Sequence, residues 1–265
     1  MRPEPAFPLL TSPLRFRARV LLACCTVVAV GLGVLFWHQT GVDGLDRAVD
    51  DWVIRSLGRH TLLLDWLAAP PTLGPAGLTS LIMVVICLAT GRLKGAILAV
   101  AAVPVASAVC DSVFKPLVDR ADQAYPSGHV TSVLALTAML TILVALPPQP
   151  LIRGRARLVI PLVMVVIDVG VAVAVIALRW HFLTDTIGGA AVGTGTVCAL
   201  ALLLDVPAVS RWLEPPARWL RGRCAAGATR WRGRVRRRPA ATVWPAADSA
   251  RRTRRRQRRS AAPVC

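Results

Sequence analysis

Residues 158–178 read LVIPLVMVVIDVGVAVAVIAL, with Asp168 as their single charged residue. A helix needs about 20 mostly apolar residues to cross a hydrocarbon core roughly 30 Å thick, so this stretch is long enough to span a membrane. Apolar stretches of comparable length lie at residues 20–37, 73–90, 95–113, 129–147 and 183–204. The sequence therefore predicts an all-α fold, an integral membrane bundle of about six transmembrane helices.

The composition supports the same class. Hydrophobic residues make up 55% of the 265-residue chain and charged residues 17%, whereas about a quarter of the residues in an average soluble domain are charged. The seven cysteines show no paired spacing of the kind that metal ligands or a disulfide framework require. We therefore expect a membrane protein without a bound metal or cofactor.

The first apolar stretch has two interpretations. Arg15, Arg17 and Arg19 resemble the basic flank of a signal peptide. Against this, the apolar run is long and ends at residues 37–39, Trp-His-Gln, without a small-residue cleavage site. We favour an uncleaved membrane span.

Residues 44–68 form an amphipathic stretch that is too charged to cross a membrane. We expect a helix on the membrane surface, with Trp52 and Trp66 as interfacial anchors. The apolar residues recur at helical spacing and the charged residues lie off their stripe: Leu45, Val49, Trp52, Val53 and Leu57 on the stripe, and Asp46, Asp50, Asp51 and Arg55 off it.

Positive charge is concentrated towards the C-terminal end of the chain. The formal net charge is +18, and 17 of the 32 Lys and Arg residues follow Asp205. With the N-terminus in the cytoplasm, 26 of the 32 fall in cytoplasmic segments and six outside, as the positive-inside rule favours. We predict a multi-pass protein of the cell membrane with both termini cytoplasmic. Its parts are an N-terminus at 1–19, a six-span domain at 20–205 and a basic, disordered tail at 206–265.

The tail has three interpretations. Its charge alone suffices for binding to anionic lipid headgroups or to nucleic acid. Lipid headgroups are the nearest polyanion to a cytoplasmic tail, so we rank them first and do not expect nucleic acid as a partner. A tail without a specific partner stays open as well, and the sequence does not fix an oligomeric state.

Two loops at the predicted outer face hold the polar residues best suited to phosphate chemistry. The first runs from Lys115 to His129, KPLVDRADQAYPSGH, and the second runs from Arg179 to Asp185, RWHFLTD. In the predicted topology both loops emerge on the same side of the membrane. We therefore expect their side chains to meet at one membrane face.

Five residues of these loops have the chemistry of a phosphate site. A phosphoryl group in transfer carries negative charge on its oxygens, so its site requires fixed cations and N–H donors. Lys115, Arg120 and Arg179 supply positive charge, and an Arg side chain offers a two-pronged fork. Ser127 and the backbone N–H of Gly128 lie where a helix is expected to begin, and a helix N-terminus favours a bound phosphate.

Three further residues have the chemistry of phosphoryl transfer. His181 and Asp185 are four residues apart, so they share one face of a helix. The carboxylate can then keep one ring nitrogen protonated and leave the other free to attack phosphorus. His129 is suited to protonate the leaving oxygen as a general acid.

At these positions the sequence resembles the type 2 phosphatidic acid phosphatase superfamily of membrane lipid phosphatases. Its pattern is a Lys and an Arg-Pro with six residues between them, then Pro-Ser-Gly-His, then Ser-Arg with five residues before a His and three more before an Asp. Pro126–His129 match the second part in full, and Lys115 matches the start of the first. His181 and Asp185 match the end of the third. The resemblance covers roughly residues 20–205.

Two of the cations of this pattern are absent from their expected places. Residues 122–123 are Asp-Gln where the pattern has Arg-Pro, and residues 174–175 are Ala-Val where it has Ser-Arg. Arg120 lies two residues early and Arg179 lies closer to the histidine. They are the candidates to replace the missing arginines.

The resemblance implies a metal-independent phosphatase that acts through a phosphohistidine on His181, with His129 as the acid. An outward-facing site favours polyprenyl pyrophosphate as the substrate, with phosphatidate or phosphatidylglycerol phosphate as the second choice. The alternative class is a non-catalytic, lipid-binding member of the family, because two of its cations are displaced.

Overall fold

The computed structural model describes residues 8–39, 44–69, 73–120, 125–152 and 154–213, together with residues 216 and 219. Contacts divide the chain into two units, Met1–Arg221 and Gly222–Cys265. All of the architecture below belongs to the first unit. The second unit, which is most of the predicted tail, lies outside the described residues.

Every regular element in the described part of the chain is helical, which confirms the all-α class. The helices are α1 (Ser12–Leu35), α2 (Gly44–Leu57), α3 (Thr61–Ala68), α4 (Leu73–Ala89), α5 (Leu93–Val109), α6 (Lys115–Val118), α7 (Gly128–Leu140), α8 (Val159–Ala177) and α9 (Leu183–Leu204). Three shorter pieces continue them: π-helical turns η1 (Cys110–Phe114) and η3 (Thr141–Ala145), and the 3-10 helix η4 (Gly154–Leu158).

The predicted membrane spans are found, with one difference. Among the described residues, five helical segments are long and apolar enough to cross a membrane: Ser12–Leu35, Leu93–Val118, Gly128–Ala145, Gly154–Ala177 and Leu183–Leu204. The remaining predicted span corresponds to α4, which is apolar but has only 17 residues. The first span begins at Ser12, eight residues before the predicted start at residue 20. Pro13 is compatible with this start, since proline is well tolerated in the first turn of a helix.

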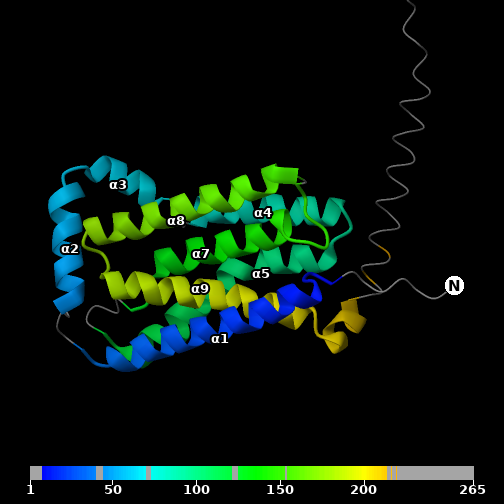
Figure 1. Ribbon diagram of the computed structural model, residues 1–265, viewed down its shortest axis with the longest axis horizontal. Coiled ribbons are helices and arrows are strands. Elements are labelled where there is room, and N and C mark those ends of the chain that lie inside the picture. Colours follow the sequence, from blue (N-terminus) through cyan, green and yellow to red (C-terminus); the bar gives the residue numbers. More distant parts are fainter. Residues whose placement is uncertain are drawn as a thin grey trace, which may run out of the picture. The chain divides into compact units, whose positions relative to one another are not determined.

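The long helices run alongside one another, and α2 lies across one end of them (Figure 1). Helix α9 packs against α1, α7 and α5, while α4 packs against α5, and α8 packs against α7 and α3. Successive spans run in opposite directions. The α5–α7 and α8–α9 connections therefore lie at the same end as α2, as the loop analysis predicts.

Close approach of α7 and α9 depends on glycine. A Cβ atom at Gly189 would lie 2.6 Å from the carbonyl oxygen of Ser127, and one at Gly193 would overlap the carbonyl oxygen of Thr131. Small residues let membrane helices pack with their backbones close together. The start of α7, which holds His129, and the start of α9, which holds Asp185, are thereby kept close together.

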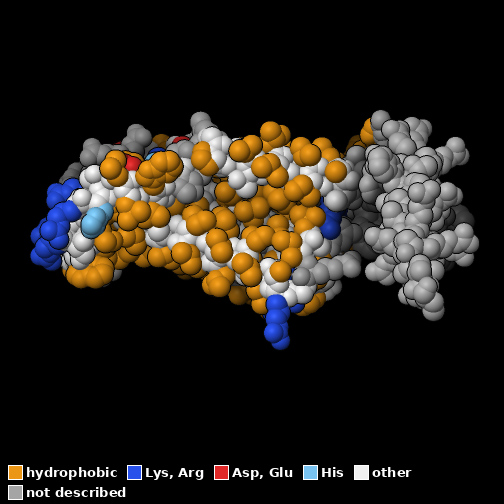
Figure 2. Space-filling view, turned by 90° about the horizontal axis from the view of Figure 1, so that it is seen from above, with side chains coloured by type: hydrophobic (Ala, Val, Ile, Leu, Met, Phe, Trp, Pro, Cys, Tyr) orange, Lys and Arg blue, Asp and Glu red, His pale blue; other side chains and the backbone are white. Residues whose placement is uncertain are grey.

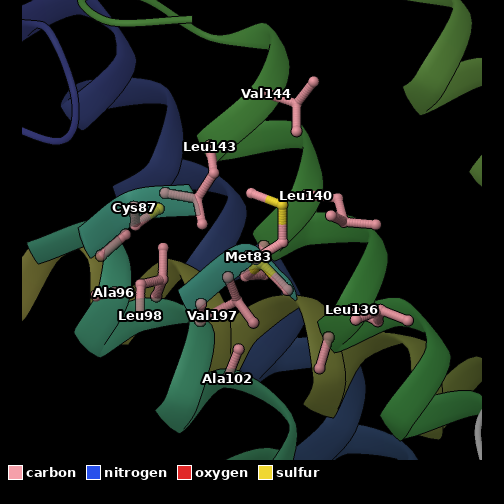
Figure 3. Close-up of a cluster of buried hydrophobic side chains, with 14 of the residues drawn as sticks. Met83, Cys87, Ala96, Leu98, Ala102, Leu136, Leu140, Leu143, Val144 and Val197 are labelled. Atoms are coloured by element: carbon pink, nitrogen blue, oxygen red, sulfur yellow. The ribbon is translucent and has the colours of Figure 1, made fainter. Parts of the chain in front are cut away.

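A hydrophobic cluster lies between α4, α5, α7 and α9, away from the α2 end (Figure 3). Met83 and Cys87 of α4 pack there against Leu98 of α5 and Leu140 of α7. Much of the outer surface is also hydrophobic, and Lys and Arg side chains gather at the end where α2 lies (Figure 2). A largely apolar surface next to a charged end is expected of a protein that spans a bilayer.

The amphipathic stretch forms two helices, α2 and α3, separated by the turn at residues 58–60. The predicted division of α2 into an apolar stripe and a polar side is wrong in part. Asp46 and Asp50 are buried together with Val53, whereas Trp52 is 64% exposed. One face of α2 thus carries carboxylates into the end of the bundle, and Trp52 is left on the outside.

The opposite end of the bundle is closed by a buried ion pair. Lys94 Nζ lies 3.2 Å from Asp205 Oδ1 and donates to Ser210 Oγ at 2.9 Å. The Asp205 carboxylate also accepts the backbone N–H groups of Leu9 and Leu10. Residues 207–213 are helical, so the folded part of the chain continues past the predicted boundary at residue 205.

Candidate functional site

Lys115 is the first residue of α6 and directly follows the π-helical turn η1 at the end of α5. A π turn adds one residue to a helical turn and is frequent at functional sites. The Lys115 Nζ lies 2.7 Å from Asp111 Oδ1, and both side chains are partly exposed. A Cβ atom at Gly128 would lie 3.7 Å from this Nζ and 3.9 Å from the Asp111 carboxylate oxygen. The ammonium group therefore lies beside the first turn of α7.

Ser127 is the N-cap of α7 and is fully buried. Its backbone N–H donates to the carbonyl oxygen of Asp185 at 3.0 Å, and its carbonyl oxygen accepts the Thr131 hydroxyl at 2.8 Å. The backbone N–H groups in the first turn of a helix have no acceptor within the helix and favour an anion. Ser127 thus fixes the position of a helix N-terminus rather than offering an open hydroxyl.

The two histidines of the pattern face each other at this end of the bundle. The ring centroids of His129 and His181 are 6.4 Å apart, and that of Trp180 is 5.4 Å from His129. A phosphoryl group is small enough to bridge two imidazole rings at such a separation. The structure therefore brings together the two residues expected to attack phosphorus and to protonate the leaving oxygen.

Asp185 lies in the first turn of α9 and is fully buried. Its Oδ2 accepts the backbone N–H of Phe182 at 2.9 Å and lies 4.0 Å from Nδ1 of His181. At 4.0 Å the contact is an ion pair at the outer limit of distance and not a hydrogen bond. Catalytic hydrogen bonds are often long in unliganded enzymes and shorten when the substrate binds.

Arg179 ends α8 in the left-handed conformation, with φ of 62°. Its backbone N–H donates to the carbonyl oxygen of Ile176, and that of Trp180 donates to Val175. This is the Schellman arrangement, in which glycine usually takes the left-handed position. The turn leaves Arg179 exposed, at the point where the chain delivers His181.

Arg120 is held inside the protein. Its Nη1 donates to Asp185 Oδ1 at 2.6 Å and to Thr184 Oγ1 at 2.9 Å, and its Nη2 donates to Asp46 Oδ2 at 2.8 Å. The guanidinium lies over the Phe36 ring, 4.2 Å from its centroid. Arg120 as a whole is 2% exposed. Its expected role as an accessible phosphate ligand does not fit this placement.

Residues 78–207 match the family model described as the PAP2 superfamily. The chain carries a PAP2 superfamily domain. The matched residues run from α4 to the end of α9 and include both loops of the site. The match supports a phosphatase-type activity on phosphate esters, and hence a hydrolase. Comparisons with curated proteins and with solved structures found no match.

The PAP2 domain gathers most of the predicted site residues at one end. Lys115, Gly128, His129 and His181 lie close together there, and the exposed Arg179 lies two residues before His181 in the chain. Ser127 and Asp185 support them from buried positions. Residues 174–175, where the family has Ser-Arg, are buried in the bundle. Residues 122–123, where the family has Arg-Pro, lie outside the described residues.

Sequence reasoning missed two carboxylates of the site, Asp46 and Asp111. Asp46 lies 74 residues before Arg120 in the chain and was assigned to the water-facing side of a surface helix. The Asp111 contact with Lys115 has i,i+4 spacing, so helical periodicity was a signal that could have identified it.

The site offers no cluster of metal ligands. Across the described part of the chain, no three or more His, Cys, Asp or Glu side chains are placed to hold a metal ion. Positive charge at the site comes from Lys115, Arg179 and the N-terminus of α7. Such groups can stabilise the charge that develops on a transferred phosphoryl group.

Proposed function

We propose that the PAP2 domain hydrolyses a lipid phosphate or pyrophosphate at the outer membrane face, through a phosphohistidine on His181 and without a metal. The observation that carries the proposal is the pair of facing imidazoles, His129 and His181, with Lys115 and the first turn of α7 beside them. An attacking base, an acid and a seat for negative charge thus lie within one small region.

The reaction divides into two steps. In the first, the Nε2 lone pair of His181 attacks phosphorus while the bond from phosphorus to the leaving oxygen breaks and His129 protonates that oxygen. In the second, neutral His129 takes a proton from water, and the resulting oxygen attacks phosphorus to release inorganic phosphate and free His181. Asp185 faces Nδ1 of His181 and favours the tautomer whose Nε2 is free.

Two features support a lipid as the substrate. The helices that present the site are apolar spans, and their outer surfaces are hydrophobic (Figure 2). A substrate that lies in the bilayer can therefore place its phosphate group at the end of the bundle without leaving the membrane. The distribution of Lys and Arg along the sequence favours an outward position for that end. For an outward site, polyprenyl pyrophosphate is the first choice of substrate and phosphatidate or phosphatidylglycerol phosphate the second.

One observation favours the non-catalytic alternative. The Arg120 guanidinium is already paired with two carboxylates, and residues 174–175 are apolar and buried. Lys115 and Arg179 are therefore the cations that remain to bind phosphate. A lipid-binding protein without turnover has the same fold and the same loops.

Phosphate release from purified protein in detergent with EDTA tests the proposal. Wild type, His181→Ala and His129→Ala are assayed on undecaprenyl pyrophosphate and on phosphatidate, with His60→Ala as the control because His60 is exposed and lies at the start of α3. We expect a loss of about a thousandfold or more in His181→Ala and about 10²–10⁴-fold in His129→Ala. His60→Ala should match the wild type.

An acid-labile phosphoenzyme that forms in the wild type and not in His181→Ala would identify the intermediate. Activity that EDTA abolishes would refute the metal-independent mechanism. A folded wild type that releases no phosphate from either lipid would establish the non-catalytic alternative.

A further inference from the structure

A buried group of charged residues lies beneath the two histidines, and the proposed mechanism leaves part of it unused. Arg120 stands between two fully buried carboxylates, Asp46 of α2 and Asp185 of α9. The rings of Phe36 and Phe182 lie 4.2 Å and 4.7 Å from its guanidinium carbon. A charge this deeply buried is tolerated when it is paired and hydrogen-bonded.

Asp46 fixes the beginning of α9 as well as Arg120. Its Oδ1 accepts the backbone N–H of Thr184 at 2.9 Å, and its Oδ2 accepts the Thr184 hydroxyl at 2.8 Å. An acidic group at this place is favoured, because the first turn of a helix presents unpaired N–H groups and the positive end of the dipole. Helix α2 is therefore tied to the turn of α9 that carries Asp185.

Asp185 is oriented from two sides. Its Oδ1 is held by the Arg120 fork and its Oδ2 by the Phe182 N–H, and Oδ2 is the oxygen that faces His181. Rotation of this carboxylate would break both contacts. The direction in which Asp185 faces His181 is thus set by Arg120, and the position of Arg120 is set by Asp46.

We propose that Arg120 and Asp46 are positioning residues of the phosphatase site, which hold Asp185 towards Nδ1 of His181. This role rests on the proposed function of His181 as the nucleophile. It assigns to the site a residue of α2, Asp46, that lies outside the part of the chain matched to the PAP2 family.

The same geometry argues against direct binding of phosphate by Arg120. Its side chain is 1% exposed, and its Nε is buried as well. One guanidinium between two carboxylates leaves the group with a net negative charge, which repels an entering phosphate. A phosphate ligand at Arg120 would have to displace a carboxylate from Nη1 or Nη2, or reach the buried Nε.

Steady-state kinetics separates the two roles. Arg120→Lys keeps the charge but loses the two-pronged fork, and Asp46→Asn keeps the shape but loses the charge. We expect kcat on the lipid substrate to fall about 10–100-fold in both, because small misplacements of a catalytic group are costly. KM and the inhibition constant of inorganic phosphate should stay within about twofold of wild type.

Two comparison variants complete the experiment. Lys115→Ala removes a cation placed beside the phosphate seat, so its inhibition constant for inorganic phosphate should rise about tenfold or more. Asp51→Asn removes an exposed carboxylate from the same helix as Asp46 and should leave the kinetics unchanged. If Arg120→Lys weakens phosphate inhibition as much as Lys115→Ala does, Arg120 is a phosphate ligand and the proposal is wrong.

Thermal unfolding of the single and double variants tests the ion group independently of activity. Arg120→Lys and Asp46→Asn both weaken the same buried contact. The loss in Tm of the double variant should therefore be smaller than the sum of the single losses. Additive losses would overturn the link. If the losses in Tm are non-additive but the wild type has no phosphatase activity, the contact between Arg120 and Asp46 is confirmed. Its catalytic role and the proposed function are then both wrong.

Discussion

At the scale of single residues, the site depends on side chains held in unusual states. Arg179 takes a left-handed conformation, which costs a residue with a Cβ atom roughly 1–2 kcal/mol. Non-glycine residues in this conformation are common at functional sites. Arg179 lies between the end of α8 and His181, a position that suits a side chain whose positive charge binds phosphate.

Substitution of Arg179 separates its charge from its backbone conformation. Arg179→Gly suits the left-handed turn, so its Tm should equal or exceed that of the wild type, whereas Arg179→Ala keeps the backbone strain. Both variants should lose about tenfold or more in phosphatase activity, because both remove a phosphate cation. Activity in Arg179→Gly that equals the wild type would show that the guanidinium is merely solvated.

Asp50 makes stability depend on pH. Burial, followed by the repulsion of the neighbouring Asp46 carboxylate, raises the pKa of Asp50 from 3.8 to about 6. Asp185 adds to this effect, while a backbone hydrogen bond from Leu183 and the charge of Arg120 oppose it. A carboxyl group with a raised pKa in the folded state keeps its proton there after the unfolded chain has lost it, so folding weakens as the pH rises.

We therefore expect the contribution of Asp50 to be most favourable below about pH 4 and to be lost as the pH rises through about 6. Asp50→Asn should raise the Tm at pH 7.5 and should flatten the change in Tm between pH 4 and 6. The exposed Asp51 supplies the matched control, Asp51→Asn, whose pH profile should follow the wild type. An unchanged profile in Asp50→Asn would contradict the raised pKa.

At the scale of elements, function depends on how α7 and α9 meet. The backbone at the start of α7 lies against α9 at Gly189, and the Ser127 N–H donates to the Asp185 carbonyl oxygen. Because His129 and Asp185 lie in the first turns of α7 and α9, and His181 lies two residues before α9, a change in helix separation alters the spacing between His129 and His181. Packing between spans is thus part of the site.

Gly193→Ala tests this contact. Its Cβ atom would meet the backbone of Thr131 and would lie 3.1 Å from the backbone nitrogen of Ala135, and overpacking of this kind costs about 1–3 kcal/mol. Gly77→Ala is the control, because a Cβ atom at Gly77 of α4 meets no atom within 4 Å. Thermal unfolding in detergent should show a lower Tm for the first variant and an equal or higher Tm for the second. Equal values for both would show that the helices can separate freely.

At the scale of the whole first unit, the site lies at one end of the spans and the Lys94–Asp205 pair at the other. In the proposed orientation, which the positive-inside rule favours, the α2 end lies outside the cell. Exposed residues mark both ends: Arg59 in the turn after α2, and Trp212 in the helix that follows Asp205.

Cysteine labelling of intact cells tests this orientation. In a chain whose seven native cysteines are replaced by Ala, a membrane-impermeant maleimide should label Arg59→Cys in intact cells. It should label Trp212→Cys only after lysis. The opposite pattern would reverse the topology and remove the argument for a substrate presented at the outer leaflet.

The sequence by itself determined the helical class, the approximate spans and the end at which the two loops meet. The physical reason is the bilayer, which forces spanning segments to satisfy their backbone hydrogen bonds within helices and so makes an apolar run readable as a span. Alternation of the spans then places Lys115, His129 and His181 together without knowledge of any contact. The i,i+4 spacing of His181 and Asp185 also predicted that they lie close together, but the predicted shared helix face is wrong. Helix α9 begins at Leu183, so His181 lies in the turn before it.

Only the tertiary structure decided the partners of Arg120 and the burial of Asp46. These contacts join residues 65 and 74 positions apart, and no periodicity within one helix reports them. The apolar stripe of α2 also gave a wrong prediction of which side faces the bundle. A membrane or interfacial environment accepts an apolar side chain such as Trp52 on the outer surface. The end of the bundle, in turn, accepts the Asp46 carboxylate because it pairs with the buried Arg120. Helix packing therefore turned the expected phosphate ligand, Arg120, into a support for Asp185.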